Sequence, residues 1–159
     1  MLSLHYMNKD DKLDMTRLSV FEPDVSSRMP LSEAGAVVAG FPSPAEDYAE
    51  GVIDLNRELV KHPATTFYAR CAGHSMLGAG IDDGDLLVVD KSIVPDDGDI
   101  AVVFIDGEFT LKRIRRDSQE DCLWLVPENS DFSPIKVTQE SNFMVWGVVT
   151  YNIRRQYGR

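Results

Sequence analysis

From residue 65 onward the sequence consists of short apolar runs separated by turns, and this pattern constrains the fold more than any other feature. The runs are rich in Val, Ile, Phe, Tyr and Thr, and Gly and Asp stand between them. β-Branched and aromatic residues favour strands, whereas Gly and Asp favour turns. We therefore expect a mostly β, compact domain with strands near residues 65–72, 85–92, 99–106, 108–116, 122–128, 134–138 and 143–153.

Acidic turns separate several of these strands. The segment DDGD occurs at residues 82–85 and again at 96–99, each time before an apolar run, and Asp106-Gly107 forms a two-residue loop typical of a β-hairpin. An EF-hand calcium loop requires alternating acids before its glycine and a glutamate at the twelfth position, and neither segment has that spacing. We therefore expect turns here, with no metal ion and no cofactor.

The first part of the chain has a different character. Residues 1–39 mix charges, prolines and scattered apolar residues, and no helical or strand period is sustained. Two prolines follow within four residues of Gly40, and proline favours extended backbone. We expect an extended, flexible N-terminal arm over residues 1–39 and a β domain over residues 40–159.

A short helix is expected between the arm and the first long strand. Its apolar anchors are Ile53, Leu55 and Leu59, and His62-Pro63 ends it. Such a helix would cover one edge of the β domain.

Charge and hydropathy exclude several classes of protein. The formal net charge is −10, which is the wrong sign for holding phosphates through the surface field, so we expect no direct, strong DNA binding. The chain offers neither an apolar stretch of signal-peptide length at its start nor about 18 consecutive apolar residues to span a bilayer. A soluble, cytoplasmic protein without a membrane anchor is expected.

Ser75, within CAGHSM, is the candidate nucleophile. The α/β-hydrolase motif G-x-S-x-G is absent, because Leu77 stands where the second glycine is required. Adjacent residues in extended backbone point to opposite sides, so His74 is poorly placed to act as the base for Ser75. A serine nucleophile here therefore needs another base.

A neutral lysine can act as that base, and Lys112 is the candidate. Strand alternation places Thr110 and Ile114 on its face and directs Arg113 to the other. Burial must lower the lysine pKa from about 10.4 for the amine to be neutral near pH 7. Position alone favours an exposed lysine on the surface of the strand over a buried base, and both interpretations stay open at this point.

Several segments carry a resemblance to a known family. They are AGFPSPAEDY at 39–48, IDLNRELVKHPATTFYARCAGHSM at 53–76, GIDDGDLLVVDKS at 80–92, GDIAVVFIDGEFTLKR at 98–113, VPENSDFSPI at 126–135 and WGVVTY at 146–151. In this number and order they resemble the LexA/UmuD family of self-cleaving Ser/Lys peptidases of the bacterial DNA-damage (SOS) response, and its UmuD branch above all. The resemblance covers essentially everything after the arm.

The resemblance implies roles for individual residues. Ser75 is the nucleophile and Lys112 its general base; the scissile bond is Ala39–Gly40; and backbone N–H groups of His74 and Ser75 receive the oxyanion. UmuD-like proteins commonly have aspartate before the serine, and His74 departs from that pattern.

The resemblance also implies partners. Residues 1–39 lack the winged helix-turn-helix of LexA-type repressors. The UmuD branch implies a homodimer whose arm is removed when a RecA filament on single-stranded DNA signals damage. The shortened protein then serves as accessory subunit of an error-prone, UmuC-type Y-family translesion polymerase.

Two alternatives belong to other classes. A non-cleaving, peptidase-like dimeric binding module could dock on a polymerase, but intact Ser75, Lys112 and Ala39–Gly40 disfavour it. Signal peptidases also use serine and lysine, and the expected lack of a membrane anchor disfavours that class.

Overall fold

The computed structural model describes residues 20–26, 30–34 and 50–157. The elements in chain order are β1 (Val20–Phe21), β2 (Pro30–Ala34), β3 (Glu50–Asp54), α1 (Leu55–Leu59), β4 (Thr66–Arg70), the 3₁₀ helix η1 (Leu77–Ala79), β5 (Leu86–Asp90), β6 (Ile100–Ile105), β7 (Glu108–Asp117), β8 (Cys122–Val126), β9 (Ile135–Val137) and β10 (Phe143–Ile153).

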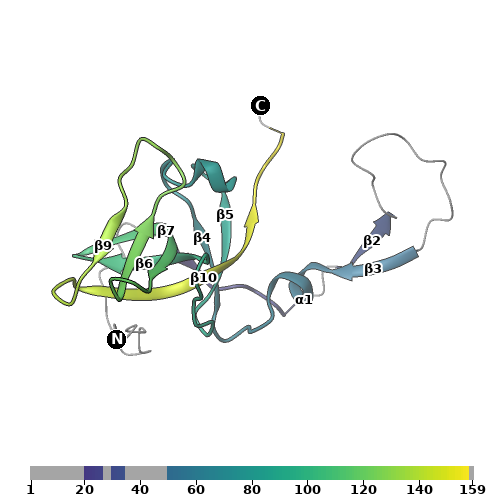
Figure 1. Cartoon of the computed structure of the whole chain (residues 1–159). Coiled ribbons are helices and arrows are strands. Elements are labelled where there is room, and N and C mark those ends of the chain that lie inside the picture. The colour runs from purple at the N-terminus through teal and green to yellow at the C-terminus, as the bar shows by residue number, and fades with distance from the viewer. Residues whose placement is uncertain (1–19, 27–29, 35–49, 158–159) are drawn as a thin grey trace.

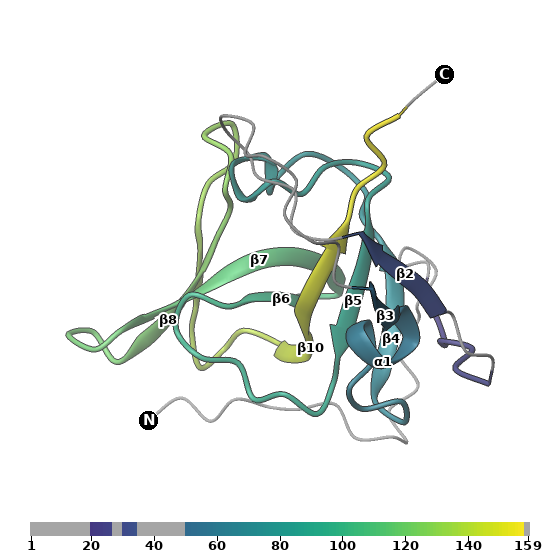
Figure 2. The same cartoon turned by 90° about the vertical axis from the view of Figure 1, so that its right-hand side faces the viewer.

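An eight-stranded antiparallel sheet forms the body of the protein, in the order β1-β4-β5-β10-β6-β7-β8-β9. It contains every strand that the apolar runs after residue 65 predict, which confirms the mostly β fold. In Figure 2, β6 and β7 run across the view while β5 and β10 run upward, so the sheet turns strongly between its halves. Irregular register in β10 between Val145 and Gly147, and again between Val149 and Tyr151, is the kind of bulge that lets a long strand bend.

The two halves of the sheet each enclose a hydrophobic cluster. The first cluster draws on β6 to β10 and the second on β4, β5, β6, β10 and the segment after β4. Neighbouring residues of β6 divide between them, because Ala101 and Val103 belong to the first and Val102 to the second. This two-sided burial explains why the β6 segment is a continuous apolar run instead of an alternating one.

The turns follow the sequence closely. Asp106 and Gly107 both have positive φ, 48° and 96°, and join Ile105 of β6 directly to Glu108 of β7 as a two-residue hairpin loop. In both DDGD segments the last N–H donates to the first carbonyl, from Asp85 to Asp82 and from Asp99 to Asp96, at 3.2 Å. The repeated motif therefore forms the same turn twice.

The predicted helix is shorter than expected. α1 covers only Leu55–Leu59, and Ile53, which the sequence suggested as a helical anchor, lies in β3. The reason is non-local, because β3 pairs with β2 along its whole length and sets Ile53 opposite Leu31. Asp54 then caps the helix, its carboxylate accepting from the Asn56 N–H at 3.1 Å.

Parts of the predicted arm take part in regular structure. β1 lies at the edge of the large sheet, with Val20 opposite Ala69 and Phe21 opposite Tyr68. β2 and β3 form a separate antiparallel ribbon, which stands apart from the large sheet in Figure 1. The predicted boundary and scissile bond at Ala39–Gly40 fall in the segment joining these two strands, outside the described residues. Within residues 20–26, 30–34 and 50–157 there is no helix with the length and apolarity to cross a membrane.

Candidate active site

Ser75 lies in a tight turn between β4 and η1. Gly73 adopts a φ of +90°, a conformation that residues with a side chain rarely adopt, and so lets the chain reverse after β4. The Ser75 carbonyl accepts a hydrogen bond from the Glu128 N–H at 2.8 Å. Met76 is only 1% exposed and packs in the second cluster, so the residue after Ser75 anchors the turn to the core.

Lys112 reaches this turn from the middle of β7. The register of β6 and β7 places it opposite Ala101, and only 6% of the residue is exposed. Its Nζ lies 3.3 Å from Ser75 Oγ. The fold thus brings together two side chains that are 37 positions apart in the sequence.

Burial sets the electrostatics of this pair. Burial lowers the pKa of Lys112 below its ordinary value, and nearby Cys71 opposes that change. Burial, followed by the charge of Asp85, raises the pKa of Cys71 to about 11, so Cys71 is an uncharged thiol at neutral pH. An uncharged thiol does not favour an ammonium, and Lys112 is therefore neutral more often than a lysine in water.

Two acceptors orient the amine of Lys112. Nζ lies 2.7 Å from Thr110 Oγ1 and 3.0 Å from the Leu111 carbonyl. A neutral amine has two N–H groups and one lone pair; when the N–H groups donate to these acceptors, the lone pair remains for the Ser75 hydroxyl. Strand alternation places Thr110 on the face of Lys112, but no sequence motif gives Thr110 a role. The position of Thr110, two residues before Lys112 on the same face of the strand, is the sequence signal that could have predicted this contact.

An open pocket adjoins Ser75. Its volume is about 110 Å³, and its lining combines the end of β4 and the following turn with the first half of β7 and neighbouring core residues: Ala69, Arg70, Cys71, Ala72, Ser75, Leu87, Val102, Phe109, Thr110 and Leu111. β8 pairs with β7 only over Arg113–Asp117, whereas β6 pairs with the half that lines the pocket. Among the strands that the structure describes, the part of β7 at Phe109–Leu111 therefore pairs on one side only, and its other edge lies beside the pocket.

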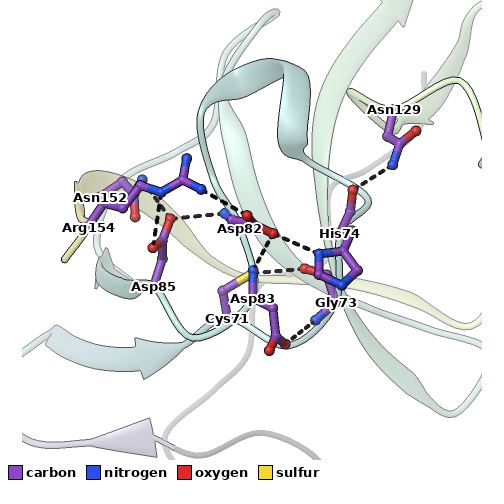
Figure 3. A network of polar contacts seen from close by, with 9 residues as sticks. All are labelled: Cys71, Gly73, His74, Asp82, Asp83, Asp85, Asn129, Asn152 and Arg154. Atoms are coloured by element: carbon purple, nitrogen blue, oxygen red, sulfur yellow. Dashed lines mark hydrogen bonds and ion pairs between the residues drawn. The ribbon is translucent and has the colours of Figure 1, made fainter. Parts of the chain in front are cut away.

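The hydrogen bonds of the described residues link the His74 ring to Asp82 and not to Ser75. Its Nδ1 lies 2.7 Å from Asp82 Oδ1, a contact drawn in Figure 3, and the His74 carbonyl accepts from Asn129 Nδ2 at 2.8 Å. Among the hydrogen bonds of the described residues, none uses the backbone N–H of His74 or Ser75. These N–H groups are the ones that the resemblance implies for the oxyanion.

One group of side chains could bring ligand atoms together for a metal. Asp117, Glu120 and Cys122, at the turn between β7 and β8, place these atoms within 4.8 Å of one another. Lys136 already pairs with the Glu120 carboxylate, and Asp117 Oδ1 accepts the Glu120 N–H at 3.2 Å. Both carboxylates thus already have partners within the protein, an ion pair for Glu120 and a hydrogen bond for Asp117.

Residues 30–150 match the Peptidase S24-like family. The chain belongs to this family of peptidases. The match includes β2 to β9 and most of β10, and with them Ser75 and Lys112.

Individual relatives of this S24-like chain agree with the assignment. Protein ImpA of Salmonella typhimurium is 45% identical over 117 residues, covering 74% of this chain and 78% of that protein. Protein MucA of Escherichia coli is 39% identical over 118 residues, covering 74% of this chain and 79% of that protein. The LexA repressor of Acidithiobacillus ferrooxidans is 42% identical over 123 residues, covering 76% of this chain and 58% of the repressor. The resemblance to the LexA/UmuD group is thereby confirmed at the level of the family.

Proposed function

We propose that this S24-like peptidase cleaves its own chain between Ala39 and Gly40, with Ser75 as nucleophile and Lys112 as general base. The observation that carries the proposal is the 3.3 Å contact between Ser75 Oγ and a buried Lys112 Nζ. A serine needs a base close enough to take its proton, and a lysine serves only when it is neutral. Burial lowers the pKa of Lys112 and so favours the neutral form that this role requires.

The first half of the reaction forms an ester. Lys112 takes the hydroxyl proton of Ser75 while Oγ attacks the carbonyl carbon of Ala39. Negative charge develops on the carbonyl oxygen, and the N–H groups of His74 and Ser75 are the proposed donors to it. The C–N bond then breaks, and protonated Lys112 gives its proton to the leaving nitrogen of Gly40.

The second half releases the arm. Lys112, neutral again, takes a proton from water as the water attacks the ester carbonyl, and it returns that proton to Ser75 Oγ as the ester bond breaks. The products are residues 1–39 with a new carboxylate and residues 40–159 with a new amino terminus. Small side chains on both sides of the bond suit a substrate strand lying against the edge of β7 beside the pocket, the edge at Phe109–Leu111 that pairs with no other described strand.

The wider role proposed is that of the UmuD branch in the SOS response. A homodimer is cleaved when it meets a RecA filament on single-stranded DNA, and the shortened form is the accessory subunit of a UmuC-type Y-family translesion polymerase. The family assignment and the 39–45% identity to the ImpA and MucA proteins support this role, together with the resemblance of the segments around Ser75 and Lys112.

The test is the intact mass of the full chain over time. The protein is incubated with and without activated RecA filament, and also at about pH 10, where lysine loses its proton without help. Two variants, Ser75→Ala and Lys112→Ala, serve as controls. Cleavage at Ala39–Gly40 gives two fragments whose masses sum to that of the chain plus one water, and both variants stay whole. A wild type that stays whole under both triggers overturns the proposal and favours the non-cleaving binding module.

A further inference from the structure

The turn that carries Ser75 is held from two sides. On one side, loop residues Glu128 and Asn129 donate to the carbonyls of Ser75 and His74, each at 2.8 Å. On the other side, the Gly73 N–H donates to Asp83 Oδ1 at 2.8 Å. The first side is a loop after β8, and the second is the acidic turn that precedes β5.

His74 adds a side-chain contact to the second side. Its Nδ1 lies 2.7 Å from Asp82 Oδ1, and Asp82 Oδ2 accepts from Arg154 Nη2 at 2.8 Å. Figure 3 shows these side chains in a line. Arg154, the residue directly after β10, lies on one side of the Asp82 carboxylate, and His74 lies on the other side. Asn152, near the end of β10, supports the same turn by donating to Asp85 Oδ2 at 3.2 Å and to the Gly80 carbonyl at 2.9 Å.

The direction of the His74 contact follows from the chemistry of its partner. The hydrogen bonds to His74 and to the Asp83 N–H lower the pKa of Asp82, so its carboxylate is ionised at neutral and alkaline pH. An ionised carboxylate only accepts hydrogen bonds, so Nδ1 of His74 must carry the proton. Both the neutral ring and the protonated ring can supply that donor, and the contact survives in the alkaline range where Lys112 is neutral.

We propose that His74, Asp82 and Arg154 form a positioning unit that fixes the Ser75 turn through the end of β10. His74 is the residue directly before the nucleophile, and its backbone is tied by Asn129 on one side and, through its ring, by Asp82 on the other. Without the ring contact, the segment from Gly73 to Ser75 is held only by the hydrogen bonds of its backbone groups. Small misplacement of a nucleophile is costly, because the attacking oxygen must meet the carbonyl carbon along a narrow range of directions.

The proposal assigns no proton transfer to His74, and this separates it from a role as base. A positioning residue lowers the rate by the same factor at every pH, whereas a base changes the shape of the pH profile. An exposed contact to a charged partner corresponds to a factor of up to about five in rate when it is lost. The inference rests on the proposed self-cleavage for this rate measurement.

The chain offers a matched control for the ion pair. The second DDGD turn has its own arginine contact, Arg115 Nη1 to Asp97 Oδ2 at 3.2 Å, and both arginine side chains are partly exposed. Arg115→Gln therefore removes a comparable charge pair from the other copy of the motif. His74→Asn keeps a side-chain N–H donor near the position of Nδ1, while His74→Ala removes it.

The experiment measures the self-cleavage rate of the full chain from about pH 7 to about pH 10. We expect His74→Ala to be about fivefold slower at each pH, Arg154→Gln about threefold slower, and His74→Asn and Arg115→Gln within about twofold of the wild type. Equal rates for His74→Ala and the wild type overturn the proposal, as does an equal effect of the two arginine variants. A changed profile shape in His74→Ala also overturns it, since that result assigns His74 to proton transfer.

A second measurement does not depend on cleavage. Amide hydrogen exchange in Ser75→Ala protein, with and without His74→Ala, reports the order of the turn directly. We expect faster exchange in the double variant at the N–H groups of Gly73 and Glu128, which donate to Asp83 Oδ1 and to the Ser75 carbonyl, and unchanged exchange in β5 and β6. Unchanged exchange at Gly73 and Glu128 overturns the positioning role. A wild type that never cleaves refutes the proposed function instead, and exchange then still decides whether His74 holds the turn.

Discussion

Replacing Thr110 by valine tests whether this hydroxyl sets the protonation and the aim of Lys112. Valine has nearly the same shape but cannot accept the hydrogen bond that Lys112 Nζ makes to Thr110 Oγ1 at 2.7 Å. A hydrogen bond involving a charged donor contributes about 1.5–3 kcal/mol, and one between neutral groups about 0.5–1.5 kcal/mol. The substitution therefore disfavours the ammonium by about 1 kcal/mol more than the neutral amine, which shifts protonation about fivefold toward the amine.

Two effects on the cleavage rate then oppose each other. The neutral amine loses one of its two orienting acceptors, which costs about 1 kcal/mol or about fivefold in rate wherever Lys112 is already neutral. Below the midpoint of the pH profile, the larger share of neutral amine offsets that loss. We expect Thr110→Val to match the wild type near neutral pH and to be about fivefold slower at alkaline pH, in time courses followed by mass.

Thr110→Ser is the control, because serine keeps the hydroxyl. It should follow the wild type at both ends of the profile. A constant ratio of Thr110→Val to wild type across the pH range would refute the reasoning, because Thr110 would then not distinguish the charged from the neutral lysine. A variant slower at neutral than at alkaline pH would reverse the predicted sign.

Three further outcomes follow from the fold. Gly147→Ala would place a Cβ 2.7 Å from Val89 Cγ1, so urea unfolding should show a loss of about 1–3 kcal/mol, and an unchanged midpoint would contradict this close approach. Burial raises the pKa of Asp90, but the hydrogen bond from His62 at 2.5 Å and its other donors outweigh burial and leave the pKa below 3.8. The stability that Asp90 gives relative to Asp90→Asn should be present above about pH 4 and decline as the pH falls through the lowered pKa; urea midpoints from neutral to acid pH that keep a constant difference would exclude this. Because the pKa of Cys71 rises from 9.0 to about 11, its alkylation by iodoacetamide at neutral pH should be about a hundredfold slower than in urea, and equal rates would contradict the raised value.

The sequence predicted the large sheet well because its signals are local. Each strand is a run of β-type residues, and each turn contains the residue that its backbone requires, as at Asp106-Gly107, where both φ values are positive. The helix around Ile53 was predicted at the wrong extent, because the pairing of β3 with β2 over Pro30–Ala34 competes with helix formation and leaves no sign in the helical spacing itself.

In the candidate site too, contacts within one strand could be predicted from the sequence, whereas contacts between distant segments could not. Alternation along β7 correctly placed Thr110 and Lys112 on one face, and their 2.7 Å contact follows from that face. The contact between Lys112 and Ser75 depends on how β7 and the end of β4 meet in space, and from the residues alone an exposed lysine remained open. The contact between Arg154 and Asp82 joins the residue directly after β10 to the turn before β5, and no local sequence pattern predicts it.

The ribbon of β2 and β3 has a consequence for the fate of the arm. Its five residue pairs join two strands of one chain, so each strand meets its partner at the high effective concentration that a tether provides. A cut at any bond between Ala34 and Glu50 places the strands on separate molecules. Their pairing then follows mass action, and a two-stranded ribbon of this length is at best marginally stable in water. Dilution alone would release the N-terminal piece, take β1 with it, and open the edge of β4 without a further chemical step.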